Sequence, residues 1–371
     1  MAEEIYSPGL EGVVAGETAI STLAGGLSYR GYSIEDLADR ACFEEVAYLI
    51  LHGELPNYGE LAAFRERLAA NAKIPDAVVD VIRRVPPAAP VMDVLRSGAS
   101  LLAHWDDEVH DNSRAANLRK AERLLAQLPL VMATAHRDGP VKLLSPRPEL
   151  SFAGNVLWLL TGREPSPRQV KAMDVSLIMY AEHEYNASTF AARVVCSTLS
   201  DLHSSVTAAI GALKGPLHGG ANERVLEVLQ AVGSPDRAEA WIRDALARKV
   251  RIMGFGHRVY KTGDVRAKYL KPLCAALATE TGHEDMERTA DVIERIVTHE
   301  KNLPPNLDWP SARIYHYLGL PVQLYTPLFV ISRITGWSAH VIEQLENNRL
   351  IRPRSRYIGP AARSFVPLEN R

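Results

Sequence analysis

Cysteine is scarce in this sequence. The 371 residues include three cysteines, Cys42, Cys196 and Cys274, which are odd in number, far apart and free of any C-x-x-C spacing. This argues against a disulfide framework and against a zinc ribbon. No uncharged apolar run reaches the ~18 residues of a membrane span, and the N-terminus lacks the basic and apolar regions of a signal peptide. The sequence therefore predicts a cytoplasmic protein that is neither exported nor membrane-embedded.

An excess of charge of either sign is also missing. Forty-two lysines and arginines stand against 44 aspartates and glutamates, which gives a net charge of −2. Nothing draws the whole molecule toward nucleic acid or an anionic membrane surface, so an anionic ligand would have to meet positive charge at a local site. At roughly 150 residues per domain, the length suggests two domains.

Alternating strand patterns are few, and the periodicity that recurs is helical. The stretch 33–53 opens with a capping-box-like pattern and predicts one helix. The stretch 166–214 is typical of two largely apolar helices with a break near 184–188, where Asn and Ser offer loop and cap chemistry. The stretch 321–347 predicts two further helices that meet after Trp337. The pattern indicates a helix-rich protein.

Two histidines stand in glycine-rich breaks of the helical pattern. His218 lies within 215–220 and His257 within 254–260. One interpretation is a turn whose glycines supply positive φ, with an incidental histidine. The other is a site where glycines let a small ligand approach the backbone and lie against the imidazole. Two such loops in one chain favour the second interpretation.

Several familiar cofactor and metal motifs are missing. The loop at Gly254 lacks the third glycine and the βαβ surroundings of a dinucleotide fingerprint, and the loop at Lys261 lacks the preceding glycines of a P-loop. His183 has no second histidine four residues after it, as a zinc protease helix needs, and no Cys/His cluster has ligand spacing. The sequence therefore predicts neither a metal nor a redox cofactor.

Two charged residues stand in apolar surroundings. Asp308 is flanked by apolar and aromatic residues that could raise its pKa toward that of a working base; the alternative is a cap for a helix that starts near Pro310. Arg333 lies in a strongly apolar helical stretch, where an unpaired buried charge is costly. Its partner is either a structural carboxylate or a substrate carboxylate held bidentately. With Arg266 and Arg352, it would suggest a small polyanionic ligand.

The motifs of this chain follow one another in the order and spacing of a known family, and the sequence resembles the citrate synthases over nearly its whole length. The segments that carry the resemblance are Leu10-Glu-Gly-Val-Val-Ala-Gly-Glu-Thr-Ala-Ile20, Tyr29-Arg-Gly-Tyr32, Ala181-Glu-His-Glu-Tyr-Asn-Ala-Ser-Thr-Phe190, Lys214-Gly-Pro-Leu-His-Gly-Gly-Ala-Asn222, Met253-Gly-Phe-Gly-His-Arg-Val-Tyr-Lys261, Asn306-Leu-Asp308 and Ile351-Arg-Pro353.

The resemblance implies an all-α fold with two domains. A large domain would comprise residues 1–220 and be completed by 319–371, and a small domain would comprise 221–318. The resemblance further implies a homodimer whose active sites are completed across the interface. The chain begins at the core that the family shares, without the extra N-terminal domain of hexameric members, so we expect the dimeric type.

The resemblance also implies a reaction and assigns residues to it. Acetyl-CoA, oxaloacetate and water would give citrate and CoA through an enol or enolate and citryl-CoA. Asp308 would remove the methyl proton, His218 would hydrogen-bond the thioester oxygen, and His257 would polarise the ketone of oxaloacetate. This pairing suits the chemistry, because a base alone would leave a prohibitive charge on the thioester oxygen.

The substrate-binding residues follow from the same resemblance. Oxaloacetate would be bound by His183, His257, Arg266, Arg333 and, from the other subunit, Arg352. CoA would be bound by Val250, Arg251, Ile252, Met253, Gly254, Gly256, Lys261 and Arg30. No metal and no redox cofactor is implied.

Two other functions compete with this interpretation. A 2-methylcitrate synthase would use propionyl-CoA with the same fold and catalytic residues, and one methylene is worth only roughly 1–3 kcal/mol, so dual activity is reasonable. The motif at 306–309 is similar to methylcitrate enzymes, whereas 216–218 and 256–258 look more like citrate enzymes. A non-catalytic helical scaffold is the remote alternative, and it is expected to have lost a catalytic residue. We favour citrate synthase.

Overall fold

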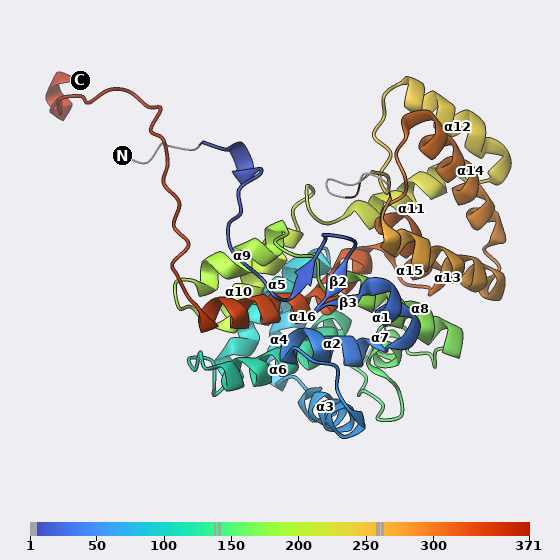
Figure 1. The fold of residues 1–371 in the computed structure, drawn as a ribbon, viewed down its shortest axis with the longest axis horizontal. Helices are drawn as coiled ribbons and strands as arrows, with labels where there is room; N and C mark the ends of the chain where they lie inside the picture. Colours follow the sequence, from blue (N-terminus) through green and yellow to red (C-terminus); the bar gives the residue numbers. More distant parts are fainter. Residues whose placement is uncertain (1–5, 137–138, 140–141, 257–259, 261–262) are drawn as a thin grey trace.

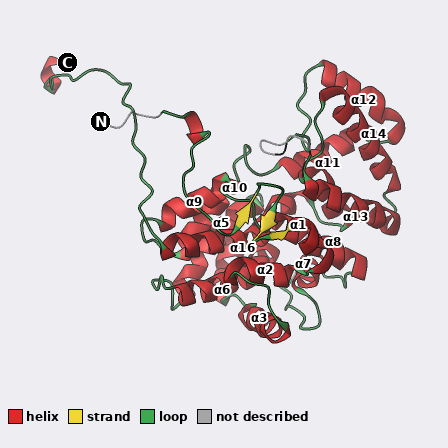
Figure 2. Ribbon diagram, viewed as in Figure 1, coloured by secondary structure: helices red, strands yellow, loops and turns green. Residues whose placement is uncertain are grey.

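Helices make up most of the structure (Figure 2). The computed structural model describes residues 6–136, 139, 142–256, 260 and 263–371. The all-α fold is confirmed. In this part of the chain the α-helices are α1 (Ile34–Arg40), α2 (Phe43–His52), α3 (Tyr58–Asn71), α4 (Asp76–Arg84), α5 (Val91–Leu102), α6 (Arg114–Ala135), α7 (Phe152–Thr161), α8 (Pro167–Tyr180), α9 (Ala187–Cys196), α10 (Leu202–Leu213), α11 (Ala221–Val232), α12 (Pro235–Ala247), α13 (Val265–Thr281), α14 (Glu284–Lys301), α15 (Asp308–Tyr317) and α16 (Tyr325–Glu346).

Shorter elements accompany these helices. Three two-residue strands form a small antiparallel sheet in the order β1 (Ser21–Thr22), β2 (Ser28–Tyr29) and β3 (Tyr32–Ser33), with Ser21 opposite Tyr29. The 3-10 helices of the described residues are η1 (Pro8–Leu10), η2 (Ala103–Trp105), η3 (Val322–Leu324) and η4 (Leu368–Asn370). The sheet matters for function because Ser21 and Tyr29 both contact the loop that follows α8.

The helix predicted over 33–53 is two helices, so the prediction of one was wrong. Ser33 caps α1, as expected, since its hydroxyl accepts a hydrogen bond from the Asp36 amide. The chain then becomes extended at Ala41, and a second capping interaction opens α2, where the Cys42 amide donates to Glu45 at 2.8 Å. A second cap inside a continuous apolar pattern ends one helix and begins another.

The stretch 166–214 holds three helices instead of two. The predicted break is present between α8 and α9. A second break at 197–201 was missed; there Leu199 takes a φ of +68° and the Asp201 side chain caps α10 through the Ser204 amide. Asp201 followed by Ser204 is the sequence signal that marks this start.

For the stretch 321–347 the prediction of two helices was wrong. A single helix, α16, runs without a break through Trp337. Gly336, which precedes Trp337, lies inside this helix and allows close packing against another segment. A Cβ atom at position 336 would collide with the Glu182 carboxylate and the Ala181 carbonyl. A glycine inside a helix can therefore mark an approach by another segment rather than an end.

The helices form two lobes, which Figure 1 shows side by side. Helices α11 to α15 stand together on one side, and we call them the small lobe. The remaining helices form the large lobe, and α16 returns to its centre, where it packs on α2, α6, α8, α9 and α10. The domain boundaries at 220 and 319 stay predictions.

The terminal segments leave the large lobe on the side away from the small lobe (Figure 1). Residues 352–371, which we call the tail, are exposed along their whole length. Apolar side chains of the tail share this exposure, including Ile358 at 91% and Phe365 at 82%. In the part of the chain that the structure describes, none of the helices combines the length and apolar character that crossing a membrane requires.

Candidate active site

A cavity of about 510 Å³ brings together the residues that the sequence singled out, although these come from five separate segments. The segments are the α8–α9 loop, the loop before α11, and the helices α13, α15 and α16. From them, His183, His218, Arg266, Asp308 and Arg333 all line the cavity. The cavity thus lies where the small lobe meets the large one, and we call it the cleft.

His218 is held in one tautomer by the start of α9. Its Nε2 atom lies 3.2 Å from the backbone N–H of Ser188, which can only donate, so Nε2 is the acceptor and Nδ1 carries the proton. Burial, followed by the positive charge of Arg333, lowers the pKa of His218 to about 4. The imidazole is therefore neutral at pH 7 and is a hydrogen-bond donor through Nδ1.

The backbone around His218 requires its glycines. The Gly219 amide donates to the Gly215 carbonyl at 3.0 Å, and a Cβ atom at position 219 would collide with the Leu213 carbonyl. Gly220 takes a φ of +79° where α11 begins. The loop is a tight turn, and this turn places His218 in the lining of the cleft, whereas its contact with a ligand stays a prediction.

Asp308 lies at the first turn of α15, which begins two residues earlier than Pro310. The expected alternative, a helix cap, is wrong, because the N-cap position of α15 is Leu307 and Asp308 lies inside the helix. The carboxylate instead accepts a hydrogen bond from the Tyr180 hydroxyl at 2.8 Å. Burial raises the pKa of Asp308, and the Tyr180 hydrogen bond and the charge of Arg266 offset part of this increase. A carboxylate with a raised pKa is better matched to proton abstraction.

The two arginines of the cleft differ in their partners. Arg266 is 5% exposed and forms a bidentate pair with Asp264, with both N···O distances at 2.9 Å. Arg333 is 1% exposed, and its Nε donates to the Tyr180 carbonyl at 2.6 Å. Among the described residues, no carboxylate lies within 4.0 Å of the Arg333 guanidinium. The structural salt bridge considered for Arg333 is therefore not formed there.

His183 meets a residue from the small-lobe side of the cleft. Its Nε2 lies 3.0 Å from the Tyr260 hydroxyl, and the two rings are nearly perpendicular with centroids 5.5 Å apart. Burial raises the pKa of Tyr260 to about 12, so the hydroxyl keeps its proton at pH 7. His257 and Lys261, which flank Tyr260 in the sequence, lie outside the described residues.

A smaller cavity of about 150 Å³ adjoins the cleft and is lined by the expected CoA loop, including Arg251, Ile252, Met253, Gly254 and Gly256. Asn306 lines both cavities. Its amide side chain donates to the Gly256 carbonyl at 2.9 Å, and its Oδ1 accepts from the Asp308 amide at 3.0 Å. The loop expected to bind CoA and the segment carrying Asp308 are therefore one connected unit.

The remaining predicted contacts lie apart from both cavities. Val250 precedes the loop and is 44% exposed. Arg30 donates to the carbonyls of Ile50 and Ala19, at 2.9 and 3.4 Å. Arg352 opens the exposed tail. The roles assigned to these three residues stay predictions.

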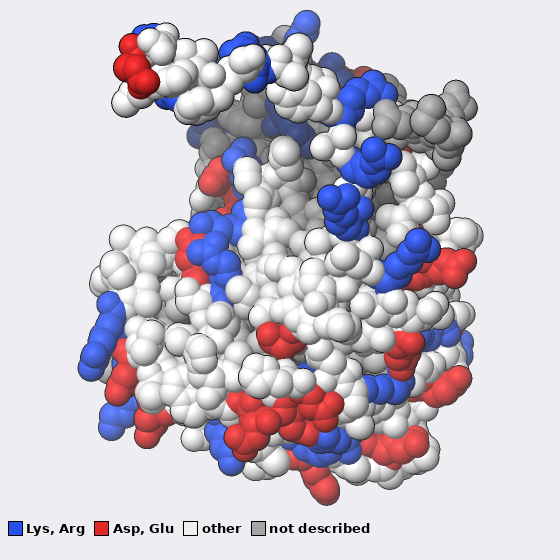
Figure 3. All heavy atoms as spheres, turned by 90° about the vertical axis from the view of Figure 1, so that its left-hand side faces the viewer, with Lys and Arg blue, Asp and Glu red and all other residues white. Residues whose placement is uncertain are grey.

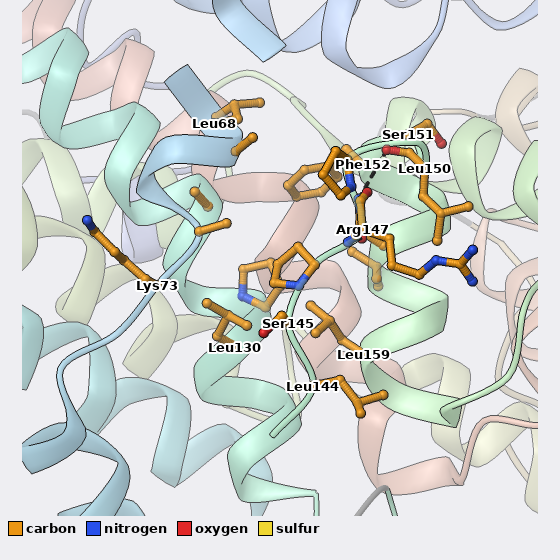
Figure 4. A pocket seen from close by; sticks show the side chains of 18 of the residues that line it. Leu68, Lys73, Leu130, Leu144, Ser145, Arg147, Leu150, Ser151, Phe152 and Leu159 are labelled. Atoms are coloured by element: carbon orange, nitrogen blue, oxygen red, sulfur yellow. Dashed lines mark hydrogen bonds between the residues drawn. The ribbon is translucent and has the colours of Figure 1, made fainter. Parts of the chain in front are cut away.

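A larger cavity of about 690 Å³ lies in the large lobe, between α3, α6, α7 and the loop at 143–150 (Figure 4). Its wall is mostly apolar, with Leu68, Leu130 and Leu159 around the opening shown there. It contains none of the predicted site residues. The cleft, and not this larger cavity, gathers buried titratable groups, which is typical of a catalytic site.

Three functional residues were missed by sequence reasoning. Tyr180 and Ser188 hold Asp308 and His218, and Tyr260 contacts His183. Their positions in the sequence were the available signal. Tyr180 and Ser188 lie within eight residues of the predicted His183, and Tyr260 is next to the predicted Lys261. In the described residues, no group of three His, Cys, Asp or Glu side chains is arranged to hold a metal ion.

Known proteins match this chain over its whole length. The family model described as citrate synthase, C-terminal domain, matches residues 9–354. Citrate synthase 2 of Bacillus subtilis (strain 168) is 48% identical over 98% of both chains. The 2-methylcitrate synthase of Shewanella oneidensis is 45% identical, over 100% of this chain and 99% of that one.

A solved structure agrees. The ternary complex of carboxymethyl coenzyme A and oxaloacetate with citrate synthase from the archaeon Thermoplasma acidophilum has a TM-score of 0.92 and 36% identity, and covers 100% of both chains. The fold is therefore that of a condensing enzyme of the transferase class. The chain belongs to the citrate synthase family.

Proposed function

We propose that this protein condenses acetyl-CoA with oxaloacetate and water to give citrate and CoA. One observation carries the proposal: the buried Arg333, without a carboxylate partner among the described residues, lines the same cleft as Asp308 and the neutral His218. An unpaired buried charge costs several kcal/mol, so the cleft favours an anionic ligand. The names of the relatives support oxaloacetate as this ligand.

The first step of the proposed reaction is enolisation. The Asp308 carboxylate removes a proton from the methyl group of acetyl-CoA, and the electron pair moves onto the thioester oxygen. The Nδ1–H of His218 donates a hydrogen bond to that oxygen, because Nε2 is occupied by the start of α9. A preorganised donor in a site with little water stabilises the developing charge far more than it would in bulk solvent.

The second step joins the two substrates. The enol carbon attacks the ketone carbon of oxaloacetate, and the ketone oxygen takes a proton, which the family resemblance assigns to His257. Water then hydrolyses the thioester of citryl-CoA to give citrate and CoA. The two carboxylates of oxaloacetate are proposed to bind Arg333, Arg266, His183 and, from a second subunit, Arg352.

The CoA moiety is proposed to lie along the loop at 250–256. This loop lines the cavity that adjoins the cleft, so a thioester in the cleft and an adenine at the loop can belong to one molecule. Lys261 and Arg30 are proposed as phosphate contacts on the family resemblance alone. The proposed steps use side chains of the chain itself, so we expect full activity in the presence of EDTA, and restoration by added Zn²⁺ or Mg²⁺ would contradict this.

A homodimer is the proposed assembly. The side of the molecule on which α9, α10 and the terminal segments lie presents a broad surface with few charged residues at its centre (Figure 3). Partly exposed side chains of α9 and α10 are small or apolar, namely Phe190, Ala191, Val194, Thr207, Ala208 and Gly211. A second copy would cover these side chains, and the exposed tail could then reach its cleft with Arg352. We expect such a dimer in the cytoplasm.

Propionyl-CoA is the alternative acyl donor, and it is favoured by the likeness of 306–309 to methylcitrate enzymes and by relatives of that name at 45% identity. The experiment is steady-state kcat/KM for both acyl-CoAs with oxaloacetate. We expect the larger value for acetyl-CoA. A larger value for propionyl-CoA would establish the alternative, and no turnover with either would contradict the proposed function.

A further inference from the structure

A buried hydrogen-bonded chain lies behind the oxaloacetate side of the cleft. Its members come from three helical segments: Glu182 follows α8, Arg193 lies on α9 and His340 lies on α16. Glu182 and His340 are fully buried, and Arg193 is 2% exposed. The cavity lining does not include these side chains, so they do not touch the substrate.

The chemistry of the three side chains gives the chain a direction. Both Nε and Nη2 of Arg193 lie near Nδ1 of His340, at 3.0 and 2.8 Å. A guanidinium only donates, so Nδ1 accepts and the ring proton of His340 is on Nε2. That Nε2 lies 2.9 Å from a carboxylate oxygen of Glu182 and donates to it. Arg193 thus orients His340, and His340 orients Glu182.

The Glu182 end of the chain fixes the backbone on both sides of His183. The carboxylate accepts a hydrogen bond from the Ser21 hydroxyl at 3.0 Å, and the same hydroxyl accepts from the Glu184 amide at 3.0 Å. The Tyr29 hydroxyl donates to the Glu182 carbonyl at 3.0 Å. Glu184 has a φ of +54°, which a non-glycine residue adopts only when its surroundings enforce it.

Close packing of α16 holds Glu182 from the remaining side. Position 336 must be glycine, because any Cβ atom there would collide with the Glu182 carboxylate. The Arg193 end is anchored as well, through an ion pair with Glu343 and a hydrogen bond to Gln344 at 3.0 Å. The chain therefore has little freedom at either end.

We propose that Arg193, His340 and Glu182 are positioning residues, and that they set the place of His183 in the oxaloacetate site. We call them the relay. The proposal rests on the proposed function, since it assumes that His183 binds oxaloacetate. If the relay is broken, the loop on both sides of His183 loses its support. Oxaloacetate binding then weakens even though every residue that touches it is still present.

The test compares oxaloacetate affinity by calorimetry in the wild type, His340→Leu and His340→Gln. Leucine removes the hydrogen bonds of His340 to Arg193 and to Glu182. Displacement of a binding group by about 1 Å can cost up to 10²-fold, so we expect affinity weaker by roughly 10- to 100-fold. Glutamine can still donate toward Glu182, so His340→Gln should recover part of the loss.

A matched control separates positioning from general destabilisation. His203 is also a buried histidine of the large lobe facing a carboxylate, 1% exposed and 3.6 Å from Asp106, but it does not line the cleft. His203→Leu should bind oxaloacetate as the wild type does, with circular dichroism confirming that each variant is folded.

The outcomes are distinct. A folded His340→Leu variant that binds oxaloacetate within twofold of the wild type would overturn the relay, as would an equal loss in His203→Leu. If His340→Leu does not fold, Arg193→Lys replaces it, because lysine keeps the charge but cannot make both contacts with His340; unchanged affinity there would again overturn the proposal. A wild type that binds no oxaloacetate would contradict the proposed function itself.

Discussion

The small lobe and the large lobe each form one wall of the cleft, and each wall carries a buried arginine. The two arginines differ in their partners. On the small-lobe wall, Arg266 is neutralised within the wall by Asp264, which also accepts from the Leu307 amide next to Asp308. On the large-lobe wall, the Arg333 guanidinium donates to the Tyr180 carbonyl and lies over the Phe329 ring, and no carboxylate of the described residues lies within 4.0 Å of it. Burial lowers the pKa of Arg333. Burial also acts to lower the pKa of Arg266, but Asp264, together with Tyr260 and Tyr29, more than offsets it and raises that pKa.

Because of this difference, we expect the two walls to have separate functions. The small-lobe wall is electrostatically complete without a ligand and carries the proposed base. The large-lobe wall is incomplete until an anion arrives, and a desolvated arginine gains most from a carboxylate. We therefore expect oxaloacetate to bind first to the large-lobe wall, and the small-lobe wall to supply the chemistry.

The largest effect is expected when the small-lobe wall loses its base. Asp308→Asn keeps the size and the contact with Tyr180 but cannot remove a proton, so kcat should fall by about 10²–10⁴-fold. Oxaloacetate affinity, measured by calorimetry, should stay within a few-fold of the wild type. Wild-type kcat in a folded Asp308→Asn sample would show that the base is another group.

Loss of Arg333, the cation of the large-lobe wall, should weaken the binding of oxaloacetate. Arg333→Gln removes the charge that the ligand pairs with, and such truncations cost about 2–5 kcal/mol, which is at least roughly 30-fold in oxaloacetate affinity. Arg123→Gln, which breaks the pair with Asp106 elsewhere in the large lobe, is the control and should bind normally. Equal affinities of Arg333→Gln and the wild type for oxaloacetate would refute the assignment of Arg333.

The smallest of these effects concerns Tyr180, whose hydroxyl crosses from the large-lobe wall to Asp308. Asp308 is active as a carboxylate, so its raised pKa places the acid limb of kcat/KM above the pH expected for an ordinary aspartate. The Tyr180 hydrogen bond lowers that pKa, and Tyr180→Phe should move the acid limb to higher pH. The pH profile of kcat/KM measures the shift, and a limb that stays in place or moves to lower pH would contradict the role of Tyr180.

The sequence identified residues that line the cleft, but not the residues that hold them in place. Glycine-flanked histidines, an aspartate among apolar residues and an arginine in an apolar helix stand out locally, and His218, Asp308 and Arg333 do meet in one cavity. Tyr180 and Ser188 act through contacts between residues far apart in the chain, with Asp308 and His218 respectively. No periodicity or local pattern encodes such contacts.

Prediction of the fold from the sequence was limited in the same way, because contacts between distant residues were not visible in it. Helix content followed from the apolar spacing, but boundaries depended on the neighbours of each residue. Two helices were predicted over 321–347, whereas α16 is continuous there and Gly336 inside it allows close packing against Glu182. Conversely, the break at Ala41 was hidden by an apolar pattern that continues across it. Tertiary contacts decided both cases.

The division of tasks between the two walls is tested by the affinity of the protein for carboxymethyl-CoA, measured by calorimetry with and without saturating oxaloacetate. If oxaloacetate completes the large-lobe wall and draws Arg266 of the small lobe toward the same ligand, it favours the state in which the two walls close on an acyl-CoA. We expect clearly tighter binding of carboxymethyl-CoA when oxaloacetate is present, and a smaller gain in Arg266→Ala. Equal affinity of the wild type in both conditions would show that oxaloacetate does not favour closure of the two walls.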